Sequence, residues 1–251
     1  MDARAAALAF ARETHARCAD ERLVWDHGEL LRTRSLDKVW AVNVALALGP
    51  PPALSLDDVD ELLGATFAGR FSSAMFEEGE ATERLEAQAR ERGWRVEHEL
   101  FMVLRREPDR VADTSAVREG TEAEIRPLME RWNEEELSDQ GPETLAQLAT
   151  FVDREWSARP TRSLVAGDAE ATCRVWSEGG VAQVEAVYTA PEARGRGYAR
   201  ALLTRALELA REDEPDVVFI VADDDDTPKE LYARLGFDPV ARLTRVVREA
   251  A

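Results

Sequence analysis

The residues best suited to bind a charged ligand form a short loop, 191–199, with the sequence PEARGRGYA. The loop follows an apolar, β-rich stretch at 181–188 and precedes a stretch in which leucines and alanines recur at helical spacing. Glycines at a strand-to-helix turn let the backbone approach a ligand closely, and free N–H groups at a helix start attract anions. The segment is therefore a candidate phosphate-binding loop.

Three kinds of nucleotide-binding loop could explain these glycines, and the spacing separates them. A Walker A loop requires Lys-Ser/Thr after its last glycine, whereas Gly197 is followed by Tyr198 and Ala199. A dinucleotide-binding fingerprint requires a third glycine at the position of Arg200. The remaining pattern, Arg-x-x-Gly-x-Gly/Ala, is met by Arg194, Gly197 and Ala199, and it resembles the pyrophosphate loop of the GNAT superfamily of N-acetyltransferases.

A second segment, 231–237 with the sequence LYARLGF, resembles the family's helix that carries Leu-Tyr and ends at Gly-Phe. The resemblance extends over about 117–247, and two motifs in the expected order are more specific than either alone. Without the upstream loop, Tyr232 would be better explained as an aromatic residue of the core. The match assigns Tyr232 the role of proton donor to the leaving thiolate of coenzyme A. One departure is Asp225 at a position where the family often has asparagine, which leaves a cofactor contact there open.

The resemblance implies a GNAT-like fold and acetyl-CoA as the cofactor. The pyrophosphate would contact the amides of 195–199, while Arg194 and Arg196 would supply positive charge. The pantetheine arm would lie along the strand before the loop, where a backbone N–H would polarise the thioester carbonyl. The residues expected to contact the cofactor are Val187, Tyr188, Thr189, Arg194, Gly195, Arg196, Gly197, Tyr198 and Ala199.

The acceptor amine needs a base, because an alkyl ammonium has a pKa of about 10.4 and is protonated at neutral pH. No histidine occurs in 115–251, so a carboxylate acting directly or through water is the available choice. Glu185 is the candidate, because it lies on the strand expected to flank the thioester. Period-two alternation would place it on the same face as Val187 and Thr189. A salt-bridged role for Glu185, and a base among residues 134–136, are open alternatives.

The composition excludes several classes of partner. A formal net charge of −18 would repel phosphate backbones, so nucleic acid is not expected, and a cationic acceptor is favoured. No apolar run approaches the roughly 20 residues that span a bilayer. Cys18 and Cys173 form no disulfide framework, and His15 with Cys18 lacks a second ligand pair. We therefore expect a cytoplasmic protein with no membrane segment and no metal.

A polar segment at 107–114 indicates a linker between an N-terminal domain, 1–110, and a catalytic domain, 115–251. In the second domain, Thr121 and Glu124 have the spacing of a capping box, which predicts a helix start. The order of elements predicts an α/β fold with a mixed sheet. Strands are expected near 117–119, 163–166, 172–176, 181–188 and 217–222, and helices are expected to begin near 121, 143, 199 and 227.

The N-terminal half shows a weaker form of the same pattern. Residues 91–104 resemble 234–247, since both contain a helix ending at Gly-aromatic followed by an alternating strand. A strand at 39–48, a turn, and a helix from about residue 56 extend the similarity. We therefore expect a degenerate GNAT-like copy.

This first copy lacks the groups that the chemistry needs. Its strand-to-helix turn is Gly49-Pro50-Pro51-Pro52, and proline has no backbone N–H to offer a phosphate. Ala89 stands where the second copy has Tyr232. The N-terminal half should therefore not bind cofactor, and a role as scaffold or in shaping the substrate site is expected.

Together these features predict an enzyme that moves an acetyl group from acetyl-CoA to a primary amine of a small molecule or peptide by direct transfer. An alternative of a different class is a non-catalytic acyl-CoA-binding sensor or partner-binding module, because the same loop would bind the cofactor in both. No motif indicates the acceptor, the acyl chain length or the oligomeric state.

Overall fold

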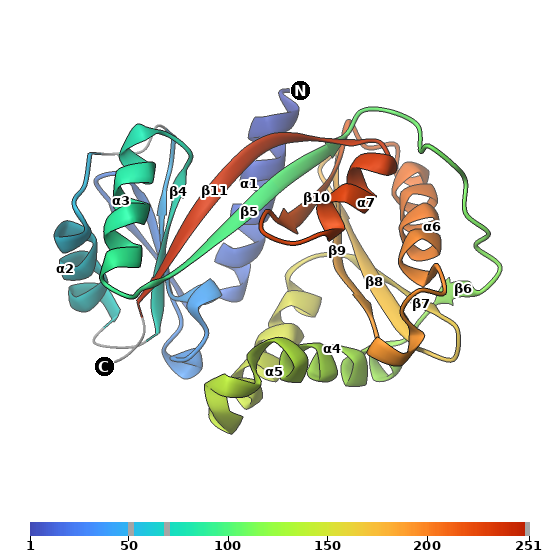
Figure 1. Cartoon of the computed structure of the whole chain (residues 1–251), viewed down its shortest axis with the longest axis horizontal. Coiled ribbons are helices and arrows are strands. Elements are labelled where there is room, and N and C mark those ends of the chain that lie inside the picture. The colour runs from blue at the N-terminus through green and yellow to red at the C-terminus, as the bar shows by residue number, and fades with distance from the viewer. Residues whose placement is uncertain (50–52, 68–70, 249–251) are drawn as a thin grey trace.

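The computed structural model describes residues 1–49, 53–67 and 71–248, in which eleven strands form one mixed sheet with helices on both faces (Figure 1). The order across the sheet is β1-β2-β3-β4-β11-β5-β10-β9-β8-β7-β6. The predicted α/β fold with a mixed sheet is confirmed. None of the described helices combines the length and apolar character that crossing a bilayer would require.

The C-terminal half follows the predicted order of elements. α4 begins where expected, because Thr121 and Glu124 form a reciprocal capping box. Strands β7, β8 and β9 pair antiparallel, whereas β9 and β10 are parallel and are connected by α6. The elements are β6 (Val117–Glu119), α4 (Glu122–Leu137), α5 (Gly141–Ala158), β7 (Thr161–Ala166), β8 (Ala171–Glu178), β9 (Val181–Thr189), α6 (Tyr198–Glu212), β10 (Val217–Asp223), α7 (Pro228–Arg234) and β11 (Phe237–Arg248).

The N-terminal half contains a second parallel pair, β3 and β4, connected by α2. A helix and a long strand follow β4, as a helix and a long strand follow β10. The elements are α1 (Ala3–Cys18), β1 (Glu21–Trp25), β2 (Gly28–Arg32), β3 (Val44–Ala47), α2 (Leu56–Phe67), β4 (Ser72–Glu77), α3 (Glu80–Glu91) and β5 (Arg95–Leu104).

The strand predicted at 39–48 is shorter than expected, because residues 40–42 form a 3-10 turn and β3 begins only at Val44. The buried side chain of Asn43 explains the difference. Its Nδ2 donates to the carbonyl oxygens of Leu36 at 2.7 Å and Val39 at 3.0 Å, which stabilises a turn in place of an extended chain. The turn predicted at 49–52 lies outside the described residues, apart from Gly49.

The two halves exchange their last strands. β5, from the N-terminal half, lies between β10 and β11, while β11, from the C-terminal half, lies between β4 and β5. The antiparallel pair β5 and β11 crosses the centre of the molecule (Figure 1). The segment 105–116 contains no helix or strand, and the sheet runs through both halves without interruption. Each half therefore completes the hydrogen bonding of the other.

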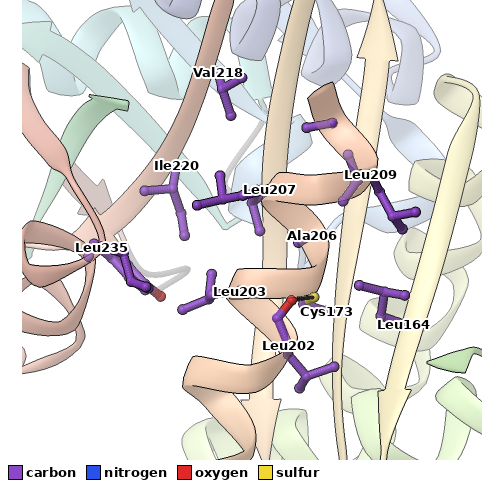
Figure 2. Close-up of a cluster of buried hydrophobic side chains, with 14 of the residues drawn as sticks. Leu164, Cys173, Leu202, Leu203, Ala206, Leu207, Leu209, Val218, Ile220 and Leu235 are labelled. Atoms are coloured by element: carbon purple, nitrogen blue, oxygen red, sulfur yellow. Dashed lines mark hydrogen bonds between the residues drawn. The ribbon is translucent and has the colours of Figure 1, made fainter. Parts of the chain in front are cut away.

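Helix α6 packs its apolar stripe on one face of the C-terminal sheet. Figure 2 shows Leu202 and Ala206 of α6 beside Leu164 and Cys173 of the sheet. The Sγ atom of Cys173 lies 3.9 Å from the carbonyl oxygen of Leu202. These side chains are at most 1% exposed, so truncating Leu202 to alanine would cost roughly 2–5 kcal/mol of stability.

The opposite face is covered by α4 and α5 and, next to them, by α1 of the N-terminal half. Phe10 of α1 packs edge-on against Phe219 of β10, with ring centroids 5.7 Å apart. The guanidinium of Arg159, at the end of α5, lies over the ring of Phe10 at 3.7 Å and donates to its carbonyl oxygen at 3.0 Å. The N-terminal helix is thus part of the core of the C-terminal half.

Candidate active site

A cleft of about 850 Å³ opens where β9 and β10 separate. The parallel pairing of these strands ends at Val184 and Ile220, so residues 185–189 of β9 have no partner in β10. Both Glu185 and Tyr232 line this cleft. The fold therefore brings to one site the two residues proposed for proton transfer, which lie 47 positions apart in the sequence.

A β-bulge in β9 shapes this part of the cleft. Arg174 of β8 pairs with Glu185 and Thr172 pairs with Tyr188, so β9 contains one extra residue between these pairs. Ala186 has a φ of 54°, a left-handed conformation that costs about 1–3 kcal/mol for a residue with a side chain. The β8–β9 pairs on either side of the bulge keep Ala186 in this strained conformation.

The bulge corrects the expected alternation of β9. Glu185 was expected on the same face as Val187 and Thr189, but the extra residue changes the phase of the strand. Ala186 and Tyr188 pack with the α4 core, and Glu185 lies on that side, whereas Val187 packs with the α6 core. Alternation fails here because a period of two assumes an unbroken strand.

The environment of Glu185 makes it a plausible base at neutral pH. Its carboxylate accepts hydrogen bonds from Gln183 Nε2 at 2.6 Å and from the N–H of Ala186 at 3.0 Å. Burial, followed by the nearby carboxylate of Glu155 on α5, raises the pKa of Glu185 to about 7. A carboxyl with this pKa can accept a proton and release it near neutrality.

Tyr232 lies on α7 and is 6% exposed, with its ring edge-on to Phe237 at a centroid distance of 6.5 Å. Burial, then the negative charge of Glu185, raises the pKa of its phenol. The phenol is therefore protonated at neutral pH and able to donate.

The arginine–glycine loop adopts the geometry of an anion cradle. Gly195 and Gly197 have φ values of 78° and 85°, and α6 starts at Tyr198. Among the described residues, the N–H groups of 195–200 donate no backbone hydrogen bond. Adjacent to them is a cavity of about 680 Å³, lined by Thr189, Arg194, Gly195, Gly197, Tyr198 and Ala199 among others. Thr189 and Arg194 also line the larger cleft, so the two spaces adjoin.

The arginines predicted to supply positive charge are already paired with carboxylates. Arg194 contacts Glu135 at 2.5 Å, and Arg196 contacts Glu170 at 2.9 Å. The loop cavity has further arginines that sequence reasoning missed, namely Arg110, Arg200 and Arg234. Arg200 directly follows the motif in sequence, whereas only the fold brings Arg110 and Arg234 to it.

Two other expected residues make local contacts. The hydroxyl of Tyr188 donates to Glu135 at 3.0 Å, and its ring stacks on Trp132 at 6.0 Å. The hydroxyl of Tyr198 donates to Glu170 at 3.1 Å. Tyr188 thus links β9 to α4, and Tyr198 links the start of α6 to Glu170. Since both hydroxyls are engaged, any cofactor contact from these residues would come from the backbone or the ring.

The N-terminal half contributes residues to the cleft that sequence reasoning did not identify. His15 of α1 and Glu97, Glu99 and Phe101 of β5 all line it. Residues 115–251 contain no histidine, but His15 of α1 and His98 of β5 line the cleft, so a histidine is present at the site. Burial lowers the pKa of His15 to about 4, so this imidazole is neutral at pH 7.

Asp225, the departure from the family pattern, contacts the N-terminal half. Its carboxylate lies 2.8 Å from Nδ1 of His98, and Nε2 of that histidine lies 3.0 Å from Glu86. Of the alternative bases at 134–136, Glu135 and Glu136 line the cleft, and the first is held by Arg194 and Tyr188. No group of three or more His, Cys, Asp or Glu placed to hold a metal occurs within the described ranges.

Comparison with known proteins supports the resemblance to the GNAT family that the two sequence motifs indicated. Residues 123–237 match the model of the Acetyltransferase (GNAT) family. No curated protein matches the chain in sequence.

Solved structures share the fold over the whole length of the chain. A functionally unknown conserved protein from Staphylococcus epidermidis aligns with a TM-score of 0.74 at 13% identity, covering 92% of this chain and 94% of that one. A GCN5-related N-acetyltransferase from Kribbella flavida aligns with a TM-score of 0.62 at 19% identity, covering 100% and 96%. Identities this low establish the shared fold alone. The resemblance predicted from the two motifs is confirmed over residues 123–237, which match the GNAT acetyltransferase family.

Proposed function

We propose that this protein transfers an acetyl group from acetyl-CoA to a primary amine of a small molecule or peptide by direct transfer. The main support for this proposal is the cleft where β9 and β10 separate, next to the glycine loop. Glu185 and Tyr232 both line this cleft. The matching family transfers acyl groups from acyl-CoA; acetyl specificity and the amine acceptor are our proposal.

The residues present fit coenzyme A. Residues 195–199 lie at the loop cavity and, among the described residues, their N–H groups donate no backbone hydrogen bond, which suits a pyrophosphate. The edge of β9 at 187–189, which does not pair with β10, suits the amides of a pantetheine arm. When bound, the cofactor would supply an activated thioester. Arg110 and Arg234, which line the same cavity, would add positive charge for the phosphate end.

Glu185 would take the proton from the attacking amine, since half of its carboxyl is ionised near pH 7. Tyr232, which stays protonated, would donate to the departing sulfur. The cleft walls include eight carboxylates and one arginine, Arg194, which favours a positively charged acceptor. The carboxylates are Glu97, Glu99, Glu135, Glu136, Glu155, Glu185, Asp223 and Asp226.

We also infer a cytoplasmic location, because Cys18 and Cys173 are both free and buried.

The direct test is release of free coenzyme A from acetyl-CoA in the presence of a panel of amines. Glu185→Gln should lower kcat/KM on the order of 100-fold and abolish the acidic limb of its pH profile, in which the wild-type rate rises through about pH 7. If the limb persists at wild-type rates, the base is another carboxylate or ordered water. Binding of acetyl-CoA with no thiol release for any amine would favour the non-catalytic sensor.

A further inference from the structure

A narrow, mostly apolar cavity of about 100 Å³ lies between α1 and strands β3, β4, β5 and β11, beside the candidate active-site cleft. Its walls include Leu8 of α1, Leu46 of β3, Met75 of β4 and Leu243 of β11. Four residues line both this cavity and the large cleft, so the two spaces share a wall. These residues are Ala11, His15, Glu99 and Phe101.

The sheet register gives the distance between the cavity and the reacting centre. Phe101 of β5 pairs with Val221 of β10, the residue after Ile220, which pairs with Val184 of β9. At about 4.8 Å between neighbouring strands, Phe101 lies two strands, or roughly 10 Å, from the strand that carries Glu185. Leu243 of β11 lies one strand further.

The polarity of the cavity selects the kind of group that could enter. At the shared wall, His15 is uncharged at neutral pH, and Glu99 is paired with the buried Arg245 at 2.6 Å. Beyond that wall, four leucines and Met75 outnumber the two charged residues, Arg12 and Glu77, and the carboxylate of Glu77 is paired with Arg4. A second ammonium group would lose its hydration there without an unpaired carboxylate to replace it, whereas an apolar group would gain from burial.

The face of the sheet on which Glu185 lies indicates which of the two substrates, the amine or the acyl-CoA, extends toward this cavity. Glu185 lies on the face of the sheet that α4, α5 and α1 cover, and the cavity lies under α1 on that same face. Tyr232 packs in the core of the opposite face. The molecule that loses a proton to Glu185 is therefore the one that extends toward α1.

We propose that the cavity is an acceptor subsite that binds the apolar arm, aliphatic or aryl, of an elongated primary amine. The proposal rests on the proposed amine acetylation. The N-terminal half, which lacks a cofactor loop, then acts as the specificity element of the enzyme, through α1, β3, β4 and the exchanged strand β5.

The test compares propylamine, hexylamine and 4-phenylbutylamine as acceptors for the full-length protein with acetyl-CoA. The subsite predicts that kcat/KM rises at least tenfold from propylamine to 4-phenylbutylamine. Leu8→Trp, which would fill the cavity, should remove most of this ratio, and Leu8→Ala should shift the preference toward bulkier arms. Leu62→Trp is the matched control, because Leu62 is a partly buried leucine of α2 in a separate core, and it should keep the ratio.

The outcomes separate the subsite from the proposed function. Propylamine turnover with no gain for longer arms would overturn the subsite alone. If no amine is acetylated, calorimetric binding of 4-phenylbutylamine decides: tenfold weaker binding to Leu8→Trp than to wild type supports the subsite, and equal or absent binding overturns it. If the Leu8 variants change only the use of octanoyl-CoA with propylamine, the arm belongs to the acyl group and the proposal is wrong.

Discussion

The two halves of the molecule contain the same succession of elements but differ in the chemistry of one turn. β3–α2–β4–α3–β5 and β9–α6–β10–α7–β11 each comprise a parallel pair joined by a helix, a second helix, and a long antiparallel strand. After β9, the N–H groups of 195–200 donate no backbone hydrogen bond within the described part of the chain, whereas after β3 the sequence continues from Gly49 into three prolines. The scaffold positions a turn, and the residues of that turn determine whether a phosphate can bind.

The space beside each parallel pair differs as well. The C-terminal pair opens a cleft of about 850 Å³, whereas α1 lies over the N-terminal pair and leaves about 100 Å³. At the equivalent helix position, Tyr232 reaches the cleft, while Ala89 is buried in its own core. We propose that the C-terminal half carries out the reaction and that the N-terminal half shapes the acceptor site.

Separating the halves should have the largest effect. Residues 1–110 alone lack β11, and residues 115–251 alone lack β5, so each fragment loses the strand that completes its sheet. We expect the full chain to unfold in one thermal transition and each fragment to show no cooperative transition by circular dichroism. Independent cooperative unfolding of either fragment would contradict the exchange.

The loop comparison can be tested with a matched pair of substitutions. Gly197 and Gly49 have φ values of 85° and 83°, and a Cβ at either would meet no atom of the described residues within 4 Å. Gly197→Val should weaken acetyl-CoA binding about 100-fold, equivalent to two lost charge-assisted hydrogen bonds of about 1.5 kcal/mol each. Gly49→Val carries the same backbone strain and should keep native affinity in calorimetry. Equal losses in both variants would mean that strain alone is responsible.

Tyr232→Phe removes the hydroxyl of Tyr232 but keeps its ring, whereas the equivalent position of α3 has only Ala89. We expect kcat to fall on the order of tenfold or more while the Kd for acetyl-CoA stays unchanged, since the ring and its packing on Phe237 are kept. Steady-state kinetics with parallel titration calorimetry would measure both. Unchanged turnover would remove Tyr232 from the mechanism.

The smallest expected effect concerns the tuning of the base. Glu155 raises the pKa of Glu185, so Glu155→Gln should lower that pKa and move the acidic limb of the kcat/KM profile to lower pH. Half a pKa unit would change the ionised fraction about threefold below the pKa. Glu143→Gln, on the exposed start of the same helix, is the control and should leave the limb in place. A limb that stays in place in Glu155→Gln would show that burial alone sets this pKa.

Local features were predictable from the sequence because they depend on neighbouring residues. The capping box at Thr121 and Glu124, the glycine loop at 194–199, and the alternating strands each carry their signal within a few positions. Together they indicated the α/β fold and the GNAT domain.

The tertiary structure alone decided how those elements combine. Alternation along β5 and β11 identifies two strands but says nothing about their neighbours, so the exchange between the halves has no sequence signal. The bulge at Ala186 requires a left-handed backbone conformation at this residue, which an alanine in the sequence does not predict. The pKa of Glu185 depends on Glu155, thirty positions away, and His15 reaches the cleft only through packing of α1. Burial and long-range contacts set these properties, and both exist only once the chain has folded.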